Sequence, residues 1–387
     1  MIFKRFMVVL CCIGLIVLLI PDTRGWFFRY HLRGVYLCGM AFCLAYLLTP
    51  LVRRVALRLG VLDIPGGRKN HDAPTPLLGG VAVYGAFATV VLLNFYFSFE
   101  MKGVALGGTL IFLLGLIDDV RELPSSFKLF VQCVAVAILI GYGVVISFFP
   151  QTTLWGIVLS WGLTAAWVIG ITNAVNCLDG LDGLATGMAV MICFFFGLIA
   201  LRTGQEFMVF LALSLCGSCL GFLPHNFRPG NRATIFLGDA GSTFLGFILA
   251  GIGVMGEWGE DHVVGLVVPV LLLGVPIFDM TFTTIMRIKE GVVRGIGEWL
   301  AYTGRDHFHH RLLDMGLEKP WATFIIWTVT MLSGLSALLL KNARGVEAVF
   351  ALAQSATIFT LMAFFMVFVK RQSVENRLTD RQEKENA

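Results

Sequence analysis

Charged residues are scarce in this chain of 387 residues. Asp, Glu, Lys and Arg make up 14% of it, whereas hydrophobic residues make up 57% and the mean hydropathy is +0.82. This composition excludes a soluble globular protein of this size and predicts an integral membrane protein. Apolar runs of about 20 residues, long enough to cross a bilayer, recur along nearly the whole chain. They leave no long soluble domain, so a single anchored soluble domain is excluded as well.

Other features that are missing narrow the class further. The chain has no Gly-x-x-x-x-Gly-Lys-Ser/Thr motif, which disfavours ATP-driven transport by that route. Its nine cysteines are scattered through apolar segments and predict no disulfide framework. Cys216-Gly-Ser-Cys219 has redox spacing, but it lies inside an apolar run and is interpreted as helix packing. No small-x-small cleavage site precedes Pro21, so residues 1–20 are predicted to be a retained helix.

The apolar runs predict an all-α polytopic membrane protein with eleven or twelve transmembrane helices. The predicted spans are residues 1–20, 34–50, 77–97, 104–117, 127–148, 154–172, 186–201, 207–224, 240–256, 263–286, 321–340 and 346–369. The expected organisation is an N-terminal anchor helix with an outer loop at 1–33, a polytopic core at 34–340, a C-terminal membrane helix at 341–370, and a charged, partly disordered cytoplasmic tail at 371–387.

The positive charges set the expected orientation. With the N-terminus inside, most of the 29 Lys and Arg residues fall in inner segments, as the positive-inside rule requires. Both termini are then cytoplasmic, and every polar cluster of the chain falls on the cytoplasmic side. A transporter is expected to keep its polar groups near mid-membrane with access to both faces. The one-sided arrangement favours an enzyme that works at the inner leaflet.

A run of amides, carboxylates and glycines lies between two strongly apolar segments, from Asn173 to Gly187. Its polar members recur every third residue, which places neighbours on adjoining parts of one helix face: Asn173, Asn176, Asp179 and Asp182. A glycine follows each Asp, so the helix is expected to end there in a tight loop. Carboxylate and amide oxygens gathered in this way suit a hard divalent cation or a phosphate with its metal. The alternative is an Asp-Gly turn that only connects two membrane helices.

Two adjacent acids, Asp118 and Asp119, end another apolar helix. Because they repel each other, one or both need a cation or a proton nearby. Their side chains point about 100° apart on a helix, so the pair can address two partners, for instance a metal and a proton to be removed. The alternative is a solvated helix end, although acids there oppose the helix dipole. Lys128, just beyond, is either a contact for a lipid phosphate or an ordinary snorkelling anchor.

Three more polar segments complete the inner side. Asp239 precedes an apolar helix and is either its N-cap, which the local sequence favours, or a metal ligand. The basic loop at 287–320 contains Arg305-Asp306-His307-Phe-His309-His310-Arg311, which is interpreted as a cradle for negative charge and not as a zinc site. Lys69 lies in a second basic, turn-rich loop, whose alternative is a plain positive-inside loop.

Together these residues form an inventory for phosphoryl transfer. Acids can hold Mg²⁺, cations and free N–H groups can neutralise phosphates, and one carboxylate is left over as a base. The harder physical problem is to bring two anions together, and a metal ion and basic loops offset that repulsion. Whether the acid pair serves as a base in a single displacement or as a nucleophile that forms an acyl-phosphate is left open by the sequence.

Four ordered motifs with membrane spans between them carry a resemblance to a known family. They are Asp118-Asp119, Asn173-x-x-Asn176-x-x-Asp179-Gly-x-Asp182-Gly-Leu-Ala, Phe236-x-Gly-Asp239-x-Gly-Ser242 and His307-x-His309-His310-Arg311. In this pattern, over residues 34–340, the chain resembles the polyprenyl-phosphate N-acetylhexosamine-1-phosphate transferases. Its His-x-His-His-Arg form is more similar to the branch that starts O-antigen, enterobacterial common antigen or teichoic acid linkage units. The N-terminal span is additional to the core that the family usually has.

The resemblance implies a Mg²⁺-dependent reaction, with Mn²⁺ as an alternative, in the inner membrane of a bacterium with the active site facing the cytoplasm. UDP-N-acetylhexosamine, with UDP-GlcNAc favoured, and undecaprenyl phosphate would give the lipid-pyrophosphoryl sugar and UMP. No nucleic acid is involved, and a homodimer is one option for the assembly.

Site roles are also carried over from the resemblance. It implies catalytic roles for Asp118, Asp119 and Asp182, and metal binding by Asp239 and Asp119. Substrate contacts are implied for Lys69, Lys128, Asn173, Asn176, Asp179, His307, His309, His310 and Arg311. The alternatives are the phospho-MurNAc-pentapeptide transferase of peptidoglycan synthesis and, from another class, an ion-coupled transporter.

Overall fold

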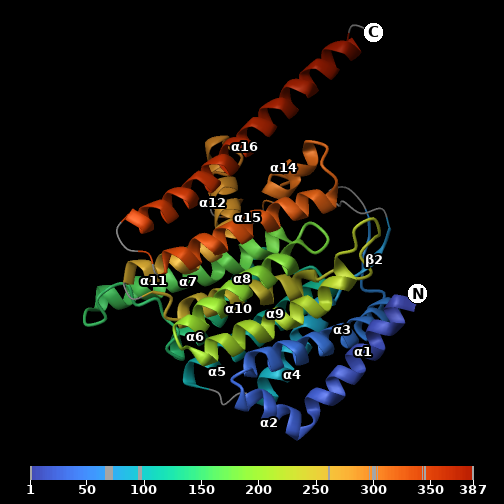
Figure 1. Cartoon of the computed structure of the whole chain (residues 1–387). Coiled ribbons are helices and arrows are strands. Elements are labelled where there is room, and N and C mark those ends of the chain that lie inside the picture. The colour runs from blue at the N-terminus through green and yellow to red at the C-terminus, as the bar shows by residue number, and fades with distance from the viewer. Residues whose placement is uncertain are drawn as a thin grey trace.

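Figure 1 shows the computed structural model of the chain, which describes residues 2–65, 73–94, 98–259, 262–295, 297–298, 302, 304–341, 343 and 346–385. Its first half contains α1 (Ile2–Leu19), α2 (Pro21–Arg29), α3 (Arg33–Leu59), β1 (Leu62–Asp63), β2 (Thr75–Pro76), α4 (Gly79–Asn94), α5 (Phe99–Val120), α6 (Ser125–Gly141) and α7 (Leu154–Leu178). Its second half contains α8 (Leu184–Arg202), α9 (Glu206–Asn226), α10 (Gly238–Met255), α11 (His262–Leu272), α12 (Gly274–Lys289), α14 (Phe308–Asp314), α15 (Lys319–Leu340) and α16 (Val346–Glu385).

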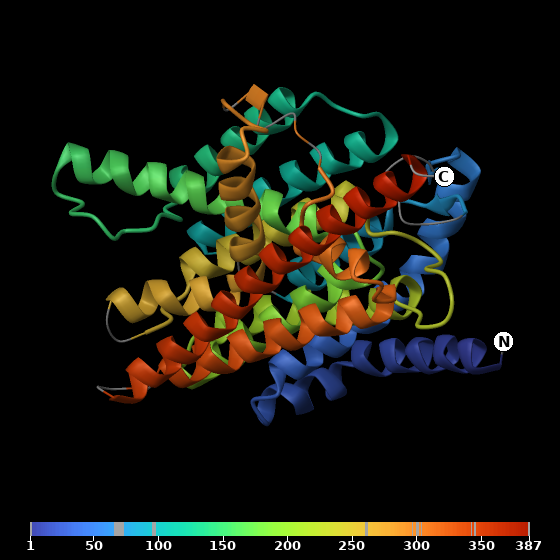
Figure 2. The same cartoon turned by 90° about the horizontal axis from the view of Figure 1, so that it is seen from above.

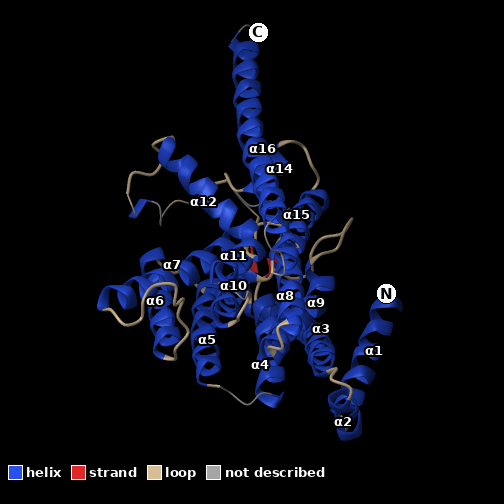
Figure 3. Ribbon diagram, turned by 60° about the vertical axis from the view of Figure 1, so that its left-hand side comes forward, coloured by secondary structure: helices blue, strands red, loops and turns tan. Residues whose placement is uncertain are grey.

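The architecture is a helical bundle whose described part contains only one short β-hairpin (Figure 3). Within the described residues, eight helices are long and apolar enough to cross a membrane, or up to ten if each of two bent helix pairs is one span. Two shorter apolar helices, α4 and α6, coincide with the remaining predicted spans. The predicted all-α polytopic membrane fold is confirmed.

One predicted span, 263–286, is broken. It consists of α11 and α12, which meet at an angle of 80°. Pro276 lies in the first turn of α12, where its missing N–H group is tolerated, whereas it could not continue a straight helix from α11. The break matters for function because α12 leads toward the histidine segment in α14.

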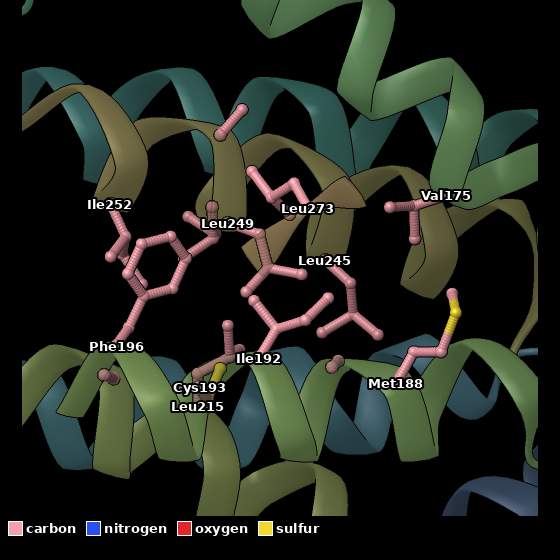
Figure 4. Packing of buried hydrophobic residues seen from close by; sticks show 14 of the residues in the cluster. Val175, Met188, Ile192, Cys193, Phe196, Leu215, Leu245, Leu249, Ile252 and Leu273 are labelled. Carbon is pink, nitrogen blue, oxygen red and sulfur yellow. The ribbon is translucent and has the colours of Figure 1, made fainter. Parts of the chain in front are cut away.

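The centre of the bundle is formed by α8, α9 and α10. Among the candidate spans α10 is the most enclosed. Of its apolar 18-residue stretch 78% is buried inside the protein, against 22% for the corresponding stretch of α16. Figure 4 shows Ile192 and Phe196 of α8 facing Leu249 and Ile252 of α10 across this core. Polar groups in contact with lipid tails have no hydrogen-bond partners there. A helix such as α10, which is enclosed by other helices and rich in small residues, can therefore carry a polar site at its end.

Helices at the two chain ends lie at the periphery. The bent pair α1 and α2 packs mainly against α3, and α16 crosses α15 and projects beyond the bundle (Figures 1 and 2). The expectation of a partly disordered tail at 371–387 differs from the structure, in which α16 continues to Glu385. The tail is rich in Arg, Gln, Glu and Lys, which are good helix formers, so the charge pattern that suggested disorder is compatible with a helix.

Several helix ends differ from the predicted ones. The helix predicted at 34–50 continues through Pro50 to Leu59. The prediction stopped too early because the last turns of this helix are basic rather than apolar. By contrast α6 ends at Gly141, so the predicted span to residue 148 was too long.

The cysteine predictions are confirmed, since all nine are free. A Cβ atom at Gly217 would lie 2.2 Å from the carbonyl oxygen of Cys38, so this part of α9 serves close packing on α3.

Candidate active site

A cleft of about 820 Å³ opens where the ends of α5 and α7 meet the starts of α6, α10 and α15. Its lining includes seven acidic side chains, from Asp63, Asp118, Asp119, Glu122, Asp179, Asp182 and Asp239. Among the described residues, the basic side chains in the lining are those of Lys128, Lys319 and His310. Acids from distant parts of the chain therefore gather at one end of the bundle.

Asp118 and Lys128 form an ion pair inside this cleft. One carboxylate oxygen of Asp118 accepts the backbone N–H of Leu123 at 2.7 Å, and the other accepts from Nζ of Lys128 at 2.6 Å. Nζ of Lys128 also lies 3.6 Å from a carboxylate oxygen of Asp239. The lysine thus points into the cleft between two acids, which favours the phosphate-contact interpretation over that of a snorkelling anchor.

Asp119 holds the beginning of α10. Its two carboxylate oxygens accept the backbone N–H groups of Asp239 at 2.7 Å and of Ala240 at 3.1 Å. These donors belong to the first turn of the helix, where N–H groups have no partner within the helix. The interpretation of Asp239 as an N-cap is wrong, because Asp119 supplies that interaction from α5 and leaves the Asp239 side chain to face the cleft.

Glycines allow α5 and α10 to approach this closely. A Cβ atom at Gly115 would lie 2.5 Å from the carbonyl oxygen of Asp239 and 2.6 Å from Cα of Ala240. Gly238 has a φ of 77°, which favours glycine, and a Cβ there would meet the carboxylate of Asp119. The backbone contact sets the position of Asp239 relative to the end of α5.

The end of α7 presents the amide and carboxylate run. The helix continues to Leu178, so the expected face on which every third residue is polar exists as far as Asn176. Oδ1 of Asn176 accepts from the hydroxyl of Ser242 at 2.7 Å, which links α7 to α10. Asn173 lies one turn further from the cleft and exchanges hydrogen bonds with Gln132 of α6, so it fixes the helix pair and does not line the cleft.

Asp179 begins the turn after α7 and faces the other acids. Burial, with the negative charges of Asp239, Asp119 and Asp182, raises its pKa well above the usual value for an aspartate. The structure therefore concentrates more negative charge at this point than the described basic residues neutralise. A cation bound here would reverse that effect.

Asp182 and Asn226 fix the loop between α9 and α10. The carboxylate of Asp182 accepts the backbone N–H of Ala233 at 3.2 Å. Oδ1 of Asn226 accepts the N–H of Gly183 at 2.9 Å, and its amide donates to the carbonyl oxygen of Ile235. The turn after α7 and the loop before α10 are thereby held to each other, which places Asp179 opposite Asp239.

The hairpin of β1 and β2 is attached to the same loop. The N–H of Phe236 donates to the carbonyl oxygen of Pro76, and the N–H of Gly79 donates back to that of Phe236. The basic segment between the two strands contains Lys69, which lies outside the described residues, so its substrate role stays a prediction.

The histidine segment approaches the cleft through α14. His310 reaches the cleft lining, and His309 is buried with its Nε2 against Gly180, where a Cβ atom would lie only 2.2 Å away. Burial lowers the pKa of His310 to about 4, helped by the charges of Arg305 and His307, and it lowers the pKa of His309 well below the usual value. Both rings are neutral at pH 7. Arg311 is half-buried and does not line the cleft.

His307 lies behind this layer. Its Nδ1 donates to a carboxylate oxygen of Asp279 at 2.7 Å, while Nη2 of Arg287 lies 3.2 Å from its Nε2. Burial opposes protonation of the ring, but the hydrogen-bonded carboxylate of Asp279 outweighs it and raises the pKa of His307.

The sequence is similar to those of known proteins. The family model described as glycosyl transferase family 4 matches residues 101–257. A relative from Bacillus subtilis, named "Probable undecaprenyl-phosphate N-acetylglucosaminyl 1-phosphate transferase", is 34% identical over 305 residues, which cover 77% of this chain and 82% of the relative. The chain belongs to the polyprenyl-phosphate N-acetylglucosamine-1-phosphate transferase family.

Further members of this transferase family match over similar lengths. "Decaprenyl-phosphate N-acetylglucosaminephosphotransferase" of Mycolicibacterium smegmatis is 35% identical over 347 residues, covering 81% of this chain and 82% of the relative. "Undecaprenyl-phosphate alpha-N-acetylglucosaminyl 1-phosphate transferase" of Escherichia coli (strain K12) is 27% identical over 288 residues, covering 71% and 75%. The family assignment by motif is confirmed.

The sequence interpretation of this transferase assigned no role to several residues that the structure brings to the site. Lys319 and Asn226 line the cleft, and Asp279 with Arg287 supports the histidine segment from α12. For Asp279 a signal existed, because an acid inside a predicted membrane span is rarely without a role. The catalytic, metal and substrate roles predicted for the residues that do meet at the cleft stay predictions.

Proposed function

We propose that this protein transfers N-acetylglucosamine-1-phosphate from UDP-GlcNAc to undecaprenyl phosphate, with release of UMP. The names of its relatives support the transferred group and the polyprenyl phosphate acceptor. The nucleotide donor follows from the chemistry, since a sugar phosphate must be displaced from a good leaving group. The bacterial relatives and the charge pattern favour the inner membrane, with the cleft at its cytoplasmic face. The bilayer then supplies the acceptor, and UDP-GlcNAc arrives from the cytoplasm.

The observation that carries this proposal is the convergence of Asp118, Asp179 and Asp239 with Lys128 in one cleft at the helix ends. Two like charges 4 Å apart repel by about 4 kcal/mol at the effective dielectric constant near a protein surface. A diphosphate and a lipid phosphate would meet that repulsion from each other and from the acids. A site with this composition therefore suits anionic substrates only together with a divalent cation.

The donor atoms fit Mg²⁺. The polar lining is dominated by carboxylate and amide oxygens, which hard cations prefer. Among the described residues no three His, Cys, Asp or Glu side chains form a ready-made metal site. Mg²⁺ is usually bound by one or two carboxylates together with substrate phosphates, so this arrangement matches Asp239 and Asp179 as ligands completed by the diphosphate. When bound, the ion would neutralise the diphosphate and activate its phosphorus toward attack; Mn²⁺ would substitute.

We propose a single displacement. Both oxygens of Asp118 and both of Asp119 accept hydrogen bonds, so neither acid is presented as a free nucleophile. An oxygen of the lipid phosphate would bond to the β-phosphorus of UDP-GlcNAc, and the bond from that phosphorus to UMP would break. A phosphate monoester has a second pKa near 6, so the lipid phosphate is already largely dianionic and needs little help from a base. Lys128 would meet this phosphate, and Asp118 would hold Lys128 in place.

The test uses the full chain in detergent with radiolabelled UDP-GlcNAc, undecaprenyl phosphate and Mg²⁺. We expect lipid-linked label and UMP in equal amounts, and we expect Asp239→Asn to raise the Mg²⁺ concentration needed for half-maximal rate. Asp22→Asn, on the exposed first turn of α2, is the matched control and should behave as wild type.

Two outcomes would contradict the proposed reaction, and a third would contradict the assignment of Asp239. Label transfer from UDP-MurNAc-pentapeptide but not from UDP-GlcNAc would assign the protein to peptidoglycan synthesis. Folded protein that yields neither labelled lipid nor UMP with a panel of UDP-sugars would exclude a transferase of this kind and reopen the transporter hypothesis. An Asp239→Asn variant with unchanged Mg²⁺ dependence would remove this residue from the metal site.

A further inference from the structure

The second half of the broken span, α12, reaches the histidine segment with two charged side chains. Asp279 and Arg287 both lie on α12, and both are buried, with 1% and 6% of their surface exposed. Neither lines the cleft. Burial of ionised groups in a membrane protein is costly, so such groups are retained where they serve a specific purpose.

Asp279 uses both carboxylate oxygens on the residues that start α14. Oδ2 accepts Nδ1–H of His307 at 2.7 Å, and Oδ1 accepts the backbone N–H of Phe308 at 2.7 Å. One bond fixes the ring and the other fixes the main chain, so rotation of this helix start about its own axis is blocked.

Arg287 binds Asp306, the residue before His307. Its guanidinium donates two parallel hydrogen bonds to Asp306, both at 2.7 Å, and lies over the ring of Tyr302 at 4.6 Å. A bidentate pair of this kind has one favoured geometry. Residues 306–308 are therefore clamped at two points by one helix.

The clamp determines where the next residues fall. His309 is driven against Gly180, in the turn that carries Asp179 and Asp182, and His310 reaches the cleft. Because α14 has only 7 residues, it lacks the length to hold its own orientation, and the clamp must supply it.

We propose that Asp279 is a positioning residue for the transfer reaction, which acts through His307 to set the placement of His309 and His310 over the UDP-sugar. This inference rests on the proposed function. It assigns the role to a residue outside the cleft. It predicts that the effect of Asp279→Asn, whose amide oxygen can still accept the N–H of Phe308, vanishes when His307 is absent.

The test is a double-mutant cycle of Asp279→Asn and His307→Gln, with steady-state kinetics for both substrates. A misplacement of about 1 Å can cost about 100-fold in rate, so we expect kcat/KM for UDP-GlcNAc to fall about 10- to 100-fold in Asp279→Asn. KM for undecaprenyl phosphate should stay within twofold. The double variant should be no more than about twofold worse than the poorer single variant. Lys289→Gln, an exposed position on the same helix, is the control and should match wild type.

A merely structural role gives a different pattern. Losses that multiply in the double variant, or equal losses for both substrates, would overturn the inference, as would wild-type kinetics in Asp279→Asn. If Asp279→Asn does not fold, Arg287→Lys keeps the charge, loses the bidentate geometry and should show the same selective loss for UDP-GlcNAc.

Binding of UDP by calorimetry separates this inference from the proposed function. We expect about 10-fold weaker UDP binding in Asp279→Asn than in wild type, whether or not lipid product forms. Equal UDP affinity in the two proteins would overturn the positioning role, whereas absence of lipid product in wild type alone would overturn the proposed reaction.

Discussion

Substitution of Gly115 by alanine tests whether the contact between α5 and α10 sets the active geometry. The added Cβ would lie 2.5 Å from the carbonyl oxygen of Asp239, whereas ordinary contact begins at 3.4 Å, so the helices must separate by about 0.9 Å. The obstructing atoms belong to the backbone of α10 and cannot rotate away. The bonds from Asp119 to the start of α10, now 2.7 and 3.1 Å, would lengthen beyond the range of a hydrogen bond.

The expected result is a large loss of activity with a smaller loss of stability. Overpacking costs roughly 1–3 kcal/mol, and alanine regains up to about 1 kcal/mol of helix propensity over glycine. Displacement of Asp239 by nearly 1 Å should lower kcat about 100-fold. The assay is the initial rate of lipid-linked GlcNAc formation at saturating substrates, with thermal unfolding in detergent measured on the same preparations.

Gly170→Ala is the matched control. This glycine lies in the middle of α7, and a Cβ there meets nothing within 4 Å, so activity should be unchanged. If Gly115→Ala kept wild-type kcat, the position of Asp239 would not depend on this contact, and the reasoning from backbone proximity would be refuted. The same conclusion would follow if both variants lost activity to the same extent.

Three further predictions concern charge and hydrogen bonding at the site. Lys128→Gln should raise KM for the lipid phosphate at least 10-fold with little change for UDP-GlcNAc, and equal shifts in both constants would argue against a lipid-phosphate contact. Asn226→Ala leaves the buried N–H of Gly183 without its acceptor and should destabilise the fold by about 1–3 kcal/mol, seen as a lower melting temperature. His310 has a folded pKa of about 4, below its ordinary value of 6.5, so the unfolded chain binds the extra proton and stability is lost as pH falls from 6.5 toward 4. The melting temperature should fall over this interval less in His310→Asn than in wild type, and parallel curves would contradict that assignment.

The membrane helices could be predicted because the bilayer demands apolar runs of a set length, which the composition displays directly. The break between α11 and α12 could not be placed from hydropathy, because Asp279 is the one charged residue in the run at 263–286, and two helices at 80° have the same hydropathy as one. Helix ends were missed where basic turns extend an apolar run, as in α3, or where an apolar run leaves the helix, as after α6.

The acidic residues of the site were predicted because they stand out against their apolar surroundings. What they contact was not predictable, since the partners are distant in sequence and unremarkable in type. The catalytic and metal roles expected of Asp119 stay predictions, whereas its hydrogen bonds to main-chain N–H groups of α10 were not expected. Asp279 and Arg287 were hidden inside or at the edge of a predicted span, where only their burial with His307 and Asp306 reveals their connection to the site.

The hydrogen bonds from the start of α10 to Asp119 also have a consequence for the order in which the polypeptide is synthesised and folds. Its two main-chain partners lie 120 and 121 positions later in the chain, so this carboxylate is synthesised long before them. At ribosomal speeds of 5–20 residues per second, about 6 to 24 s pass before they emerge. During that interval the first half of the protein lies in the bilayer while Asp119 lacks these two hydrogen-bond partners. A nascent chain arrested before residue 238 should therefore be a preferred substrate for membrane quality-control proteases, and one arrested well after residue 260 should not.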